Sequence, residues 1–296
     1  MCGIVGLFIK DPALEPELGK LTAAMLATMS DRGPDSAGFA VYGKGQKGHS
    51  KLTLRSKSAA AMKETAKRIG REFGKAEITL HDTHAVVSID DKSLPRLTSW
   101  IAKESPETEL VGSGKRMALF KEVGRPESVT ERFGLETMSG THAIGHTRMA
   151  TESAVTTDGA HPYSTGSDQC LVHNGSLSNH NNLRRVLARE GLKIETENDT
   201  EVAAGYLTWR MREGKSLGDA LKVSLDDLDG FYTFVVGTEN GFGVLRDGIA
   251  CKPAVMAETD QYVAFGSEYR VLAGLPGIEK ARIWEPEPAT VYFWER

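Results

Sequence analysis

The chain has 296 residues, of which 40% are hydrophobic, 26% charged and 7% aromatic. This composition is typical of a globular protein with a sizeable core, and it excludes intrinsic disorder as the main state. The formal net charge of −4 comes without a long basic block, so we expect no nucleic-acid partner. No stretch approaches the roughly 20 apolar residues of a membrane span, so we expect no membrane partner.

The cysteines are widely spaced, at Cys2, Cys170 and Cys251. Their number and spacing fit neither a disulfide framework nor a zinc site, so we expect reduced thiols and no metal. The apolar N-terminus lacks the basic leader of a signal peptide, which favours a cytoplasmic location. Cys170 lies in an apolar, strand-like run and is expected to be a small core residue.

Hydrophobic periodicity predicts strands and helices in no strict βαβ alternation, which indicates a layered α+β fold in a single domain over 1–296. The apolar opening at 2–9 is typical of a buried strand. The segment from about 44 to 140 is rich in charge and is expected to be an inserted α/β segment. Helices are expected at 18–29, 59–73, 94–103, 181–190, 201–212 and 217–228, and strands at 37–42, 83–89, 116–123, 143–148, 169–173, 231–237, 241–246, 262–266 and 290–294.

Two polar signals lie at the ends of predicted elements. Asn174-Gly175 is a turn signal that is expected to stop the strand at 169–173. Asp199 or Thr200 is expected to cap the helix that follows, with acidic residues in its first turn.

Cys2 is the residue with the clearest chemical potential. It follows the initiator Met1 and precedes the small Gly3, a context compatible with removal of Met1. The α-amine then exposed has a reference pKa near 8, so it can act as a general base for the thiol of the same residue. Taken alone, Cys2 fits a buried structural thiol better than it fits a nucleophile.

Several further motifs follow Cys2 in a fixed order and together resemble the glutaminase domain of class II, N-terminal nucleophile glutamine amidotransferases. The resemblance covers residues 1–43 and about 140–270, and it implies the four-layer αββα sandwich of N-terminal nucleophile hydrolases. The motifs are Cys2-Gly3-Ile4-Val5-Gly6, Arg32-Gly33-Pro34-Asp35-Ser36-Ala37-Gly38, Gly145-His146-Thr147-Arg148-Met149-Ala150-Thr151, His173-Asn174-Gly175, Asn198-Asp199-Thr200-Glu201 and Arg246-Asp247-Gly248-Ile249-Ala250-Cys251-Lys252-Pro253.

The resemblance implies a role for each matched residue in hydrolysing L-glutamine to glutamate and ammonia. Cys2 is the nucleophile that forms a thioester, and Asn174 with the Gly175 N–H stabilises the oxyanion. Arg148 and Thr151 bind the substrate α-carboxylate, and Asp199 pairs with its α-ammonium. Arg32 and His161 support the site. Taken singly, these residues fit a turn (Asn174-Gly175, Arg32), a loop (His161), a strand-end arginine (Arg148) or a helix cap (Asp199).

The overall likeness is nearest to stand-alone amidotransferase subunits related to glutamate synthase, such as the glutaminase subunit of N-methylglutamate synthase. The chain leaves no room for a synthase domain beside the glutaminase domain, so we expect the ammonia acceptor site on another chain. Glutamate synthase-like partner subunits of this type carry FMN and iron–sulfur clusters, whereas this chain is expected to need no cofactor. Met149 stands where some relatives have a tryptophan that closes the site.

Two alternatives remain open from the sequence. A stand-alone glutaminase or amide hydrolase is expected to be fully active in isolation. A non-catalytic, glutamine-sensing subunit is expected to retain Met1 and to bind glutamine unchanged. The segment at 44–140 is either a docking surface for a partner or a cover for one face of the core.

Overall fold

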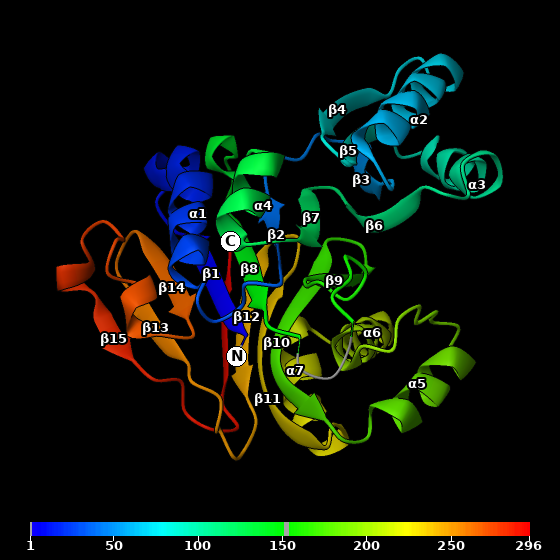
Figure 1. Ribbon diagram of the computed structural model, residues 1–296. Helices are drawn as coiled ribbons and strands as arrows, with labels where there is room; N and C mark the ends of the chain where they lie inside the picture. Colours follow the sequence, from blue (N-terminus) through cyan, green and yellow to red (C-terminus); the bar gives the residue numbers. More distant parts are fainter. Residues whose placement is uncertain (1, 151–153) are drawn as a thin grey trace.

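A computed structural model describes residues 2–150 and 154–296. Its largest sheet has seven strands in the order β15-β13-β14-β1-β8-β2-β7, each antiparallel to its neighbours. β1 lies inside this sheet, between β8 and β14 (Figure 1). The strands are β1 (Gly3–Ile9), β2 (Ser36–Tyr42), β7 (Met117–Val123), β8 (His142–Arg148), β13 (Val255–Glu258), β14 (Tyr262–Gly266) and β15 (Arg282–Trp284).

A second, five-stranded sheet packs face to face against the first. Its order is β16-β12-β11-β10-β9, and the apolar layer between the sheets joins Ile4 and Phe8 of β1 to Val172, Val235 and Phe242. β1 is therefore buried on both faces, which explains its continuous apolar sequence. The strands are β9 (Tyr163–Gly166), β10 (Gln169–Leu177), β11 (Gly230–Gly237), β12 (Gly241–Arg246) and β16 (Val291–Glu295).

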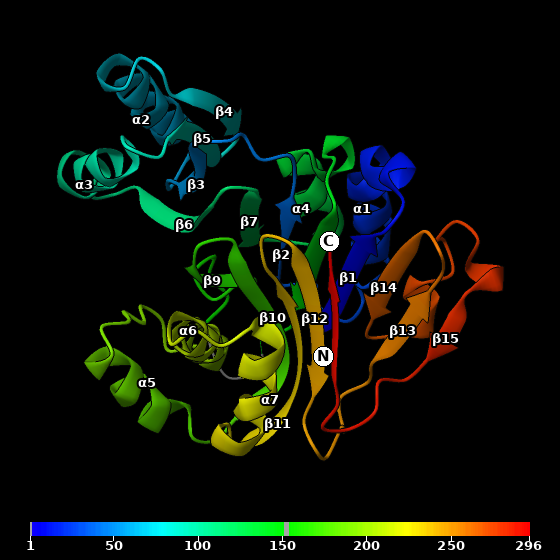
Figure 2. The same ribbon diagram turned by 180° about the vertical axis from the view of Figure 1, so that it is seen from behind.

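Helices cover the outer face of each sheet. Leu26 of α1 and Phe133 of α4 pack with Val5 and Leu7 on the outer face of the seven-stranded sheet, and α6 and α7 pack on the other sheet. The predicted four-layer αββα arrangement is confirmed (Figure 2). These helices are α1 (Leu18–Thr28), α4 (Pro126–Phe133), α5 (His180–Arg189), α6 (Asp199–Arg212) and α7 (Leu217–Asp227), with short 3-10 helices at Pro12–Glu17, Leu135–Thr137, Tyr269–Val271 and Ile278–Lys280.

Part of the segment at 44–140 forms a four-stranded subdomain with its own core, which projects from the body in Figures 1 and 2. The subdomain extends only from His49 to Gly114, because β7 and α4 belong to the body. Its strand order is β4-β5-β3-β6, and α2 and α3 cover one sheet face. The elements are β3 (His49–Arg55), α2 (Ala59–Glu72), β4 (Glu77–His81), β5 (His84–Asp90), α3 (Leu94–Glu104) and β6 (Glu109–Gly114).

β10 differs from its prediction, because it continues through Asn174-Gly175 to Leu177. The turn signal is overridden by tertiary pairing: Asn174 lies opposite Thr233 and Gly175 opposite Tyr232 on β11. Cys170, on the same strand, is fully buried as predicted. The short strands β3, β4, β6, β9, β13 and β15 and the helix α4 have no counterpart among the predicted elements.

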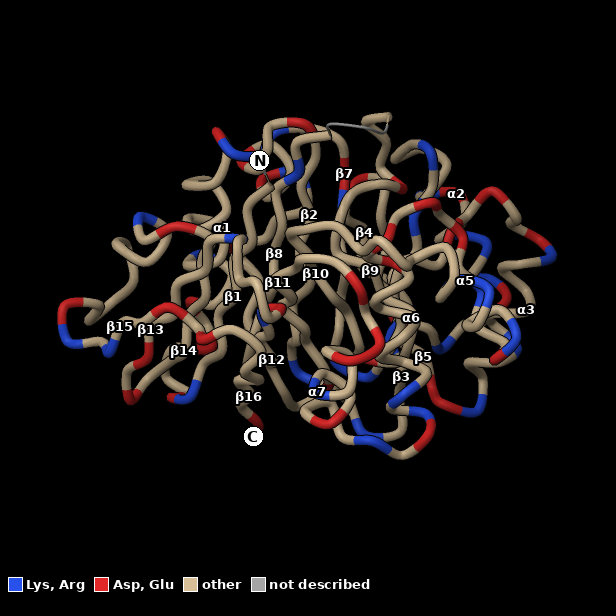
Figure 3. The backbone as a smooth tube through the Cα atoms, turned by 90° about the horizontal axis from the view of Figure 1, so that it is seen from below, with Lys and Arg blue, Asp and Glu red and all other residues tan. Residues whose placement is uncertain are grey.

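Basic and acidic residues are interspersed along the chain (Figure 3). Among the described residues, none of the helices combines the length and the apolar character that crossing a membrane requires.

Candidate functional site

A cavity of about 680 Å³ lies where β1 begins, β8 ends and β10 passes. Residues that the sequence analysis assigned to the site line it together, although they are far apart in the chain. Thr151, also assigned to the site, lies outside the described residues. The assigned residues that line the cavity are Cys2, Arg32, Arg148, His161, Asn174, Gly175 and Asp199.

Cys2 lies at the cavity wall just before β1. Its Sγ donates to the Met149 carbonyl at 3.8 Å. Its own carbonyl accepts from Arg32 Nε at 3.0 Å, and Arg32 is in turn paired with Glu268 at 2.7 Å. Gly3 pairs with Thr147 on β8, so the same register places Arg148 opposite Cys2. The strand pairing thus brings a thiol and a guanidinium to one cavity.

The Asn174 side chain is held in one orientation by three neighbours. Its Oδ1 accepts from His146 Nε2 at 3.2 Å, and its Nδ2 donates to the Cys2 carbonyl at 3.3 Å and to Ser267 Oγ at 3.2 Å. Burial lowers the pKa of His146 to about 3, so this ring is neutral at pH 7. With its proton on Nε2, it donates to the Asn174 oxygen and turns the amide nitrogen toward Cys2.

Gly175 has a backbone conformation that favours glycine, and it lies on a stretch of β10 that β9 does not pair with. Its φ is +147°, and a Cβ would lie 2.0 Å from the Phe231 carbonyl oxygen, so only glycine fits. On β11, Gly175 lies opposite Tyr232. The Tyr232 N–H donates to Asp247 Oδ1 and its carbonyl accepts from the Asp247 N–H, so neither group bonds to Gly175. Gly175 and Tyr232 therefore form a non-hydrogen-bonded pair. The Gly175 N–H therefore points away from β11, toward the edge that β9 no longer covers beyond Leu171.

Arg148 ends β8 and is 7% exposed. Its Nη1 lies 3.5 Å from the Ala154 carbonyl. Gly33 packs against the same strand end, where a Cβ would lie 2.4 Å from the Thr147 carbonyl carbon. Asp35 accepts from the Ala150 N–H at 2.8 Å. These contacts place the Arg32–Asp35 turn beside Arg148.

The prediction that Asp199 or Thr200 caps the helix is wrong, because the cap lies one or two residues earlier. Asn198 caps α6, with its Oδ1 accepting from the Thr200 N–H at 2.9 Å. Asp199 is left to accept from the Leu177 N–H at 2.9 Å, with His173 Nδ1 at 3.6 Å. Burial raises the pKa of Asp199, but its interactions with His173 and Leu177 outweigh burial, so the pKa lies below its ordinary value. Its carboxylate is charged at pH 7.

Thr200 links two histidines on the cavity wall. His161 Nε2 lies 2.7 Å and His173 Nδ1 3.1 Å from its hydroxyl oxygen, and the His161 ring stacks on His146 at 4.1 Å. Burial, together with repulsion from the neighbouring basic groups, holds the pKa of His161 well below its usual range. His161 is therefore a neutral packing and hydrogen-bonding residue in this site.

Four further residues hold site residues in place, although the sequence indicated no site role for them: His146, Thr200, Ser267 and Glu268. Ser267 and Glu268 come directly after the strand predicted at 262–266, and His146 lies within a motif of the resemblance, so these positions are the signals that could have identified them. Thr200 was considered only as a helix cap.

The loop at 247–253 borders the cavity, and Cys251, Lys252 and Pro253 line it. Asp247 Oδ2 accepts from the Ile249 N–H at 2.8 Å, and Arg246 Nη2 donates to the Lys252 carbonyl at 2.8 Å. These bonds fix the loop from within. Among the described residues, no group of three or more His, Cys, Asp or Glu side chains is placed to hold a metal ion.

Taken together, the cavity presents a thiol, amide and N–H donors beside it, a guanidinium and a charged carboxylate. A nucleophile next to fixed donors is suited to acyl transfer through a tetrahedral oxyanion. A cation and an anion that line one cavity are suited to an α-amino acid, whose carboxylate and ammonium carry the opposite charges.

Comparison with known proteins gives consistent matches. Residues 146–274 match a family model described as a glutamine amidotransferase domain. The chain is 62% identical over 296 residues to the glutamine amidotransferase-like protein GlxB of Rhizobium meliloti, covering 100% of this chain and 98% of that protein. A putative glutamine amidotransferase of Methanothermobacter thermautotrophicus is 35% identical, with 90% of this chain and 92% of that protein covered.

Among solved structures, a glutamine phosphoribosylpyrophosphate amidotransferase from B. subtilis superposes with a TM-score of 0.64 at 20% identity. The match covers 99% of this chain and 47% of that one, and it shows a shared fold.

Proposed function

The chain belongs to the glutamine amidotransferase family, and on that premise we propose that it hydrolyses L-glutamine to glutamate and ammonia through a thioester on Cys2. The observation that carries the proposal is the convergence of Cys2, Asn174, Gly175, Arg148 and Asp199 on one cavity. Its volume of about 680 Å³ accommodates a free amino acid.

Binding uses the two charged residues. The Arg148 guanidinium receives the α-carboxylate of glutamine, and the Asp199 carboxylate receives its α-ammonium. Thr151 is a further carboxylate contact in this proposal. Arg32 and His161 keep Cys2 and Thr200 in position through the hydrogen bonds described above.

Chemistry begins once Met1 has been removed and the α-amine of Cys2 is free. The amine accepts the thiol proton, and Sγ attacks the side-chain carbonyl carbon of glutamine. The oxyanion is stabilised by the Gly175 N–H and by Asn174 Nδ2, which exchanges its hydrogen bond to Ser267 Oγ for one to the oxyanion. The ammonium returns the proton to the leaving nitrogen, so ammonia departs and a γ-glutamyl thioester remains. Water then cleaves the thioester, which releases glutamate and restores the thiol.

The intact mass of the protein before and after exposure to 6-diazo-5-oxo-norleucine tests this proposal. We expect a mass without Met1 and one covalent adduct, which the Cys2→Ala variant does not form. Cys251→Ala is the matched control, because Cys251 is an exposed thiol on the same cavity and Cys170 is buried. Retained Met1 with no adduct, or an adduct lost with Cys251, would contradict the mechanism and favour a glutamine-sensing role.

We further propose that the chain is a cytoplasmic subunit that works with glutamate synthase-like partners of the N-methylglutamate synthase type, which carry the FMN and iron–sulfur cofactors. The surface around the cavity supports this part of the proposal. Several exposed large apolar side chains line or border its mouth, as expected for a docking surface. Met149 and Phe231 line the cavity, and Ile249 is exposed on the loop at 247–253 that borders it.

The partner proposal is tested by the rate of glutamine hydrolysis, measured alone and after addition of FMN-containing glutamate synthase-like subunits from the same organism. We expect the partner to increase turnover, and Ile249→Asp to abolish the increase while the basal rate stays unchanged. Ile283→Asp is the matched control, because Ile283 is an exposed isoleucine on β15, outside the loop at 247–253 that borders the cavity. Full activity without any stimulation would identify a stand-alone glutaminase.

A further inference from the structure

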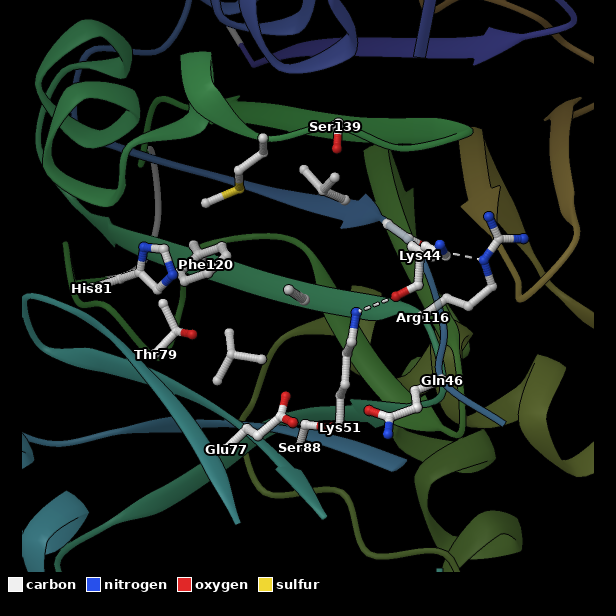
Figure 4. Close-up of a pocket in the computed structure, with 15 residues that line it drawn as sticks. Lys44, Gln46, Lys51, Glu77, Thr79, His81, Ser88, Arg116, Phe120 and Ser139 are labelled. Carbon is white, nitrogen blue, oxygen red and sulfur yellow. Dashed lines mark hydrogen bonds between the residues drawn. The ribbon is translucent and has the colours of Figure 1, made fainter. Parts of the chain in front are cut away.

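A second cavity, of about 400 Å³, lies between the subdomain and the body (Figure 4). It shares no lining residue with the Cys2 cavity. One wall comes from β3, β4 and β5, and the other from β2, β7 and the segment around Met138. Its volume lies within the range of about 300–1,000 Å³ that small-molecule sites occupy.

The subdomain wall of this cavity is polar except for Val86 of β5. Glu77 pairs with Ser88, and Ser88 pairs with Lys51, so these side chains form one row across the sheet. Thr79 and His81 follow on the same face of β4, because strand side chains alternate. The opposite face of this sheet carries the apolar residues that pack on α2 and α3.

The body wall of the cavity is apolar. Val41, Ala118 and Phe120 line it from β2 and β7, with Met138 beside them. Two sheet faces that pack to form a core are normally both apolar. Here a polar face and an apolar face enclose an open space, which suits a molecule with one polar and one apolar side.

The polar end of the cavity carries positive charge. Lys51 is half-buried, and its ammonium donates to the Lys44 carbonyl at 2.9 Å, while the Lys44 side chain lies on the same rim. Among the described residues, no carboxylate lies within 4.0 Å of Lys51 Nζ. Burial lowers the pKa of Lys51, Asp168 opposes this effect, and the charge of Arg116 adds to it.

Of the charged neighbours of Lys51, Arg116 and Asp168 are already engaged, whereas Glu77 lies on the same row, one strand beyond Ser88. Arg116 donates to the carbonyls of Gly43 and Glu239 and to the Thr141 hydroxyl. Asp168 accepts backbone N–H groups of residues 115–117 at 2.6 to 2.9 Å. The Lys51 ammonium is thus a partly desolvated cation that an anionic ligand would stabilise.

We propose that this cavity binds a small organic anion, whose acidic group pairs with Lys51 and whose apolar body lies against Phe120, Ala118 and Met138. Thr79, Ser88 and His81 supply hydrogen bonds along the polar wall. The shared chemistry is an acidic group, carboxylate or phosphate, on an apolar body. The site is separate from the Cys2 cavity and does not depend on glutamine hydrolysis.

The test uses the fluorescence of 8-anilinonaphthalene-1-sulfonate, an aromatic anion, as the reporter of one binding site. We expect 4-phenylbutyrate and phenyl phosphate to displace it from the wild-type protein. 4-Phenyl-1-butanol, which has the same apolar body without the charge, is expected to compete about tenfold more weakly. The two acidic competitors distinguish a carboxylate ligand from a phosphate ligand.

Three variants locate the site. Lys51→Gln removes the cation and is expected to weaken reporter binding by about tenfold. Ala118→Phe fills the apolar wall and is expected to abolish binding. Lys47→Gln, a matched change at an exposed lysine that does not line the cavity, is expected to leave binding unchanged.

The outcomes separate clearly. Unchanged binding in both Lys51→Gln and Ala118→Phe would overturn the proposal, as would the absence of a saturable site at millimolar reporter. Equal competition by the alcohol and the acids would show an apolar surface without anion recognition, which also overturns it. The competition experiment uses the wild-type protein, so it decides the question even if a variant does not fold.

Discussion

Asn174 lies at the centre of a hydrogen-bond chain from His146 to the Cys2 carbonyl. We expect Asn174→Ala to lower kcat by about 10²–10³-fold with little change in KM, because the amide stabilises an oxyanion that exists only in the transition state. Steady-state glutamine hydrolysis measures both constants. A proportional rise in KM with kcat unchanged would instead assign Asn174 to ground-state binding.

Asp199 offers a test that separates the two ends of the substrate. Its pKa is lowered, so it is charged at neutral pH, and Asp199→Asn removes that charge with little change in shape. We expect kcat/KM for glutamine to fall by about tenfold or more. Hydrolysis of glutaramate, which lacks the α-ammonium, should change little. An equal loss for both amides would show that Asp199 acts through the fold of β10 rather than on the ammonium.

At the scale of elements, the loop before β9 is held from two sides. Lys121 of β7 donates to the carbonyls of Asp158 and Ala160 at 3.2 and 2.9 Å, and Arg55 of the subdomain pairs with Asp158 at 2.5 Å. The loop leads directly to His161 in the Cys2 cavity. Both the body sheet and the subdomain therefore position one wall of the site.

Lys121→Met tests this contact. Burial lowers the pKa of Lys121 to about 8, so at pH 7 its ammonium is charged at a cost in stability. The variant loses two hydrogen bonds, which destabilises the fold, but it no longer carries a buried charge, which stabilises it. The two effects are of similar size. We expect an unchanged melting temperature but about tenfold lower turnover, because a displaced wall misaligns the substrate.

Lys115→Met is the control for this prediction, because Lys115 is exposed and its ammonium is 3.9 Å from Glu239. Hydrogen exchange at residues 154–162 should be faster in Lys121→Met than in the control. Wild-type turnover in the Lys121 variant would show that the loop is held without this residue.

The elements that could be predicted are those whose pattern is complete within a short stretch. β1 is apolar throughout because both faces are buried, and α6 has a cap and acidic residues at its start. β10 could not be predicted in full, because its continuation through Asn174-Gly175 depends on β11, more than 50 residues away. Short strands such as β9 and β15 owe their pairing to partners elsewhere in the chain.

The same distinction applies to the site. Cys2 is singled out by its position after Met1, and Asn174 and Asp199 by the motifs of the resemblance, and all three line one cavity. The hydrogen bond from His146 to Asn174 could not be predicted, because it depends on the distance between two sheets. The anion-binding cavity has no local motif at all, since its walls come from two units that meet only in the folded chain.

At the scale of the whole molecule, several histidines are buried in neutral form. Burial lowers the pKa of His84, His142 and His146 to about 3, and that of His161 well below its usual range. In the unfolded chain these groups titrate near pH 6.5. Between these values the unfolded chain binds more protons, so stability is full above about pH 6.5 and is lost as the pH falls.

We expect the free energy of unfolding to drop by roughly 5 kcal/mol between pH 7.5 and 5.5, a large part of a typical total. Thermal or urea unfolding over this range measures the change. Carboxylates such as Asp199, whose pKa is also lowered, contribute only below about pH 4, so they do not affect this window. A flat profile from pH 7.5 to 5.5 would mean that the histidines ionise in the folded protein.

The position of β1 between β8 and β14 also has a consequence in time. A ribosome that makes about 5–20 residues per second needs on the order of 10 s after β1 before it reaches β8, at His142–Arg148, and longer still before β14. During synthesis the first strand made therefore has no neighbour to pair with in its sheet. Enzymes that process nascent chains have that interval to reach the residues before Gly3, and the same delay leaves an apolar strand exposed to chaperones and to aggregation.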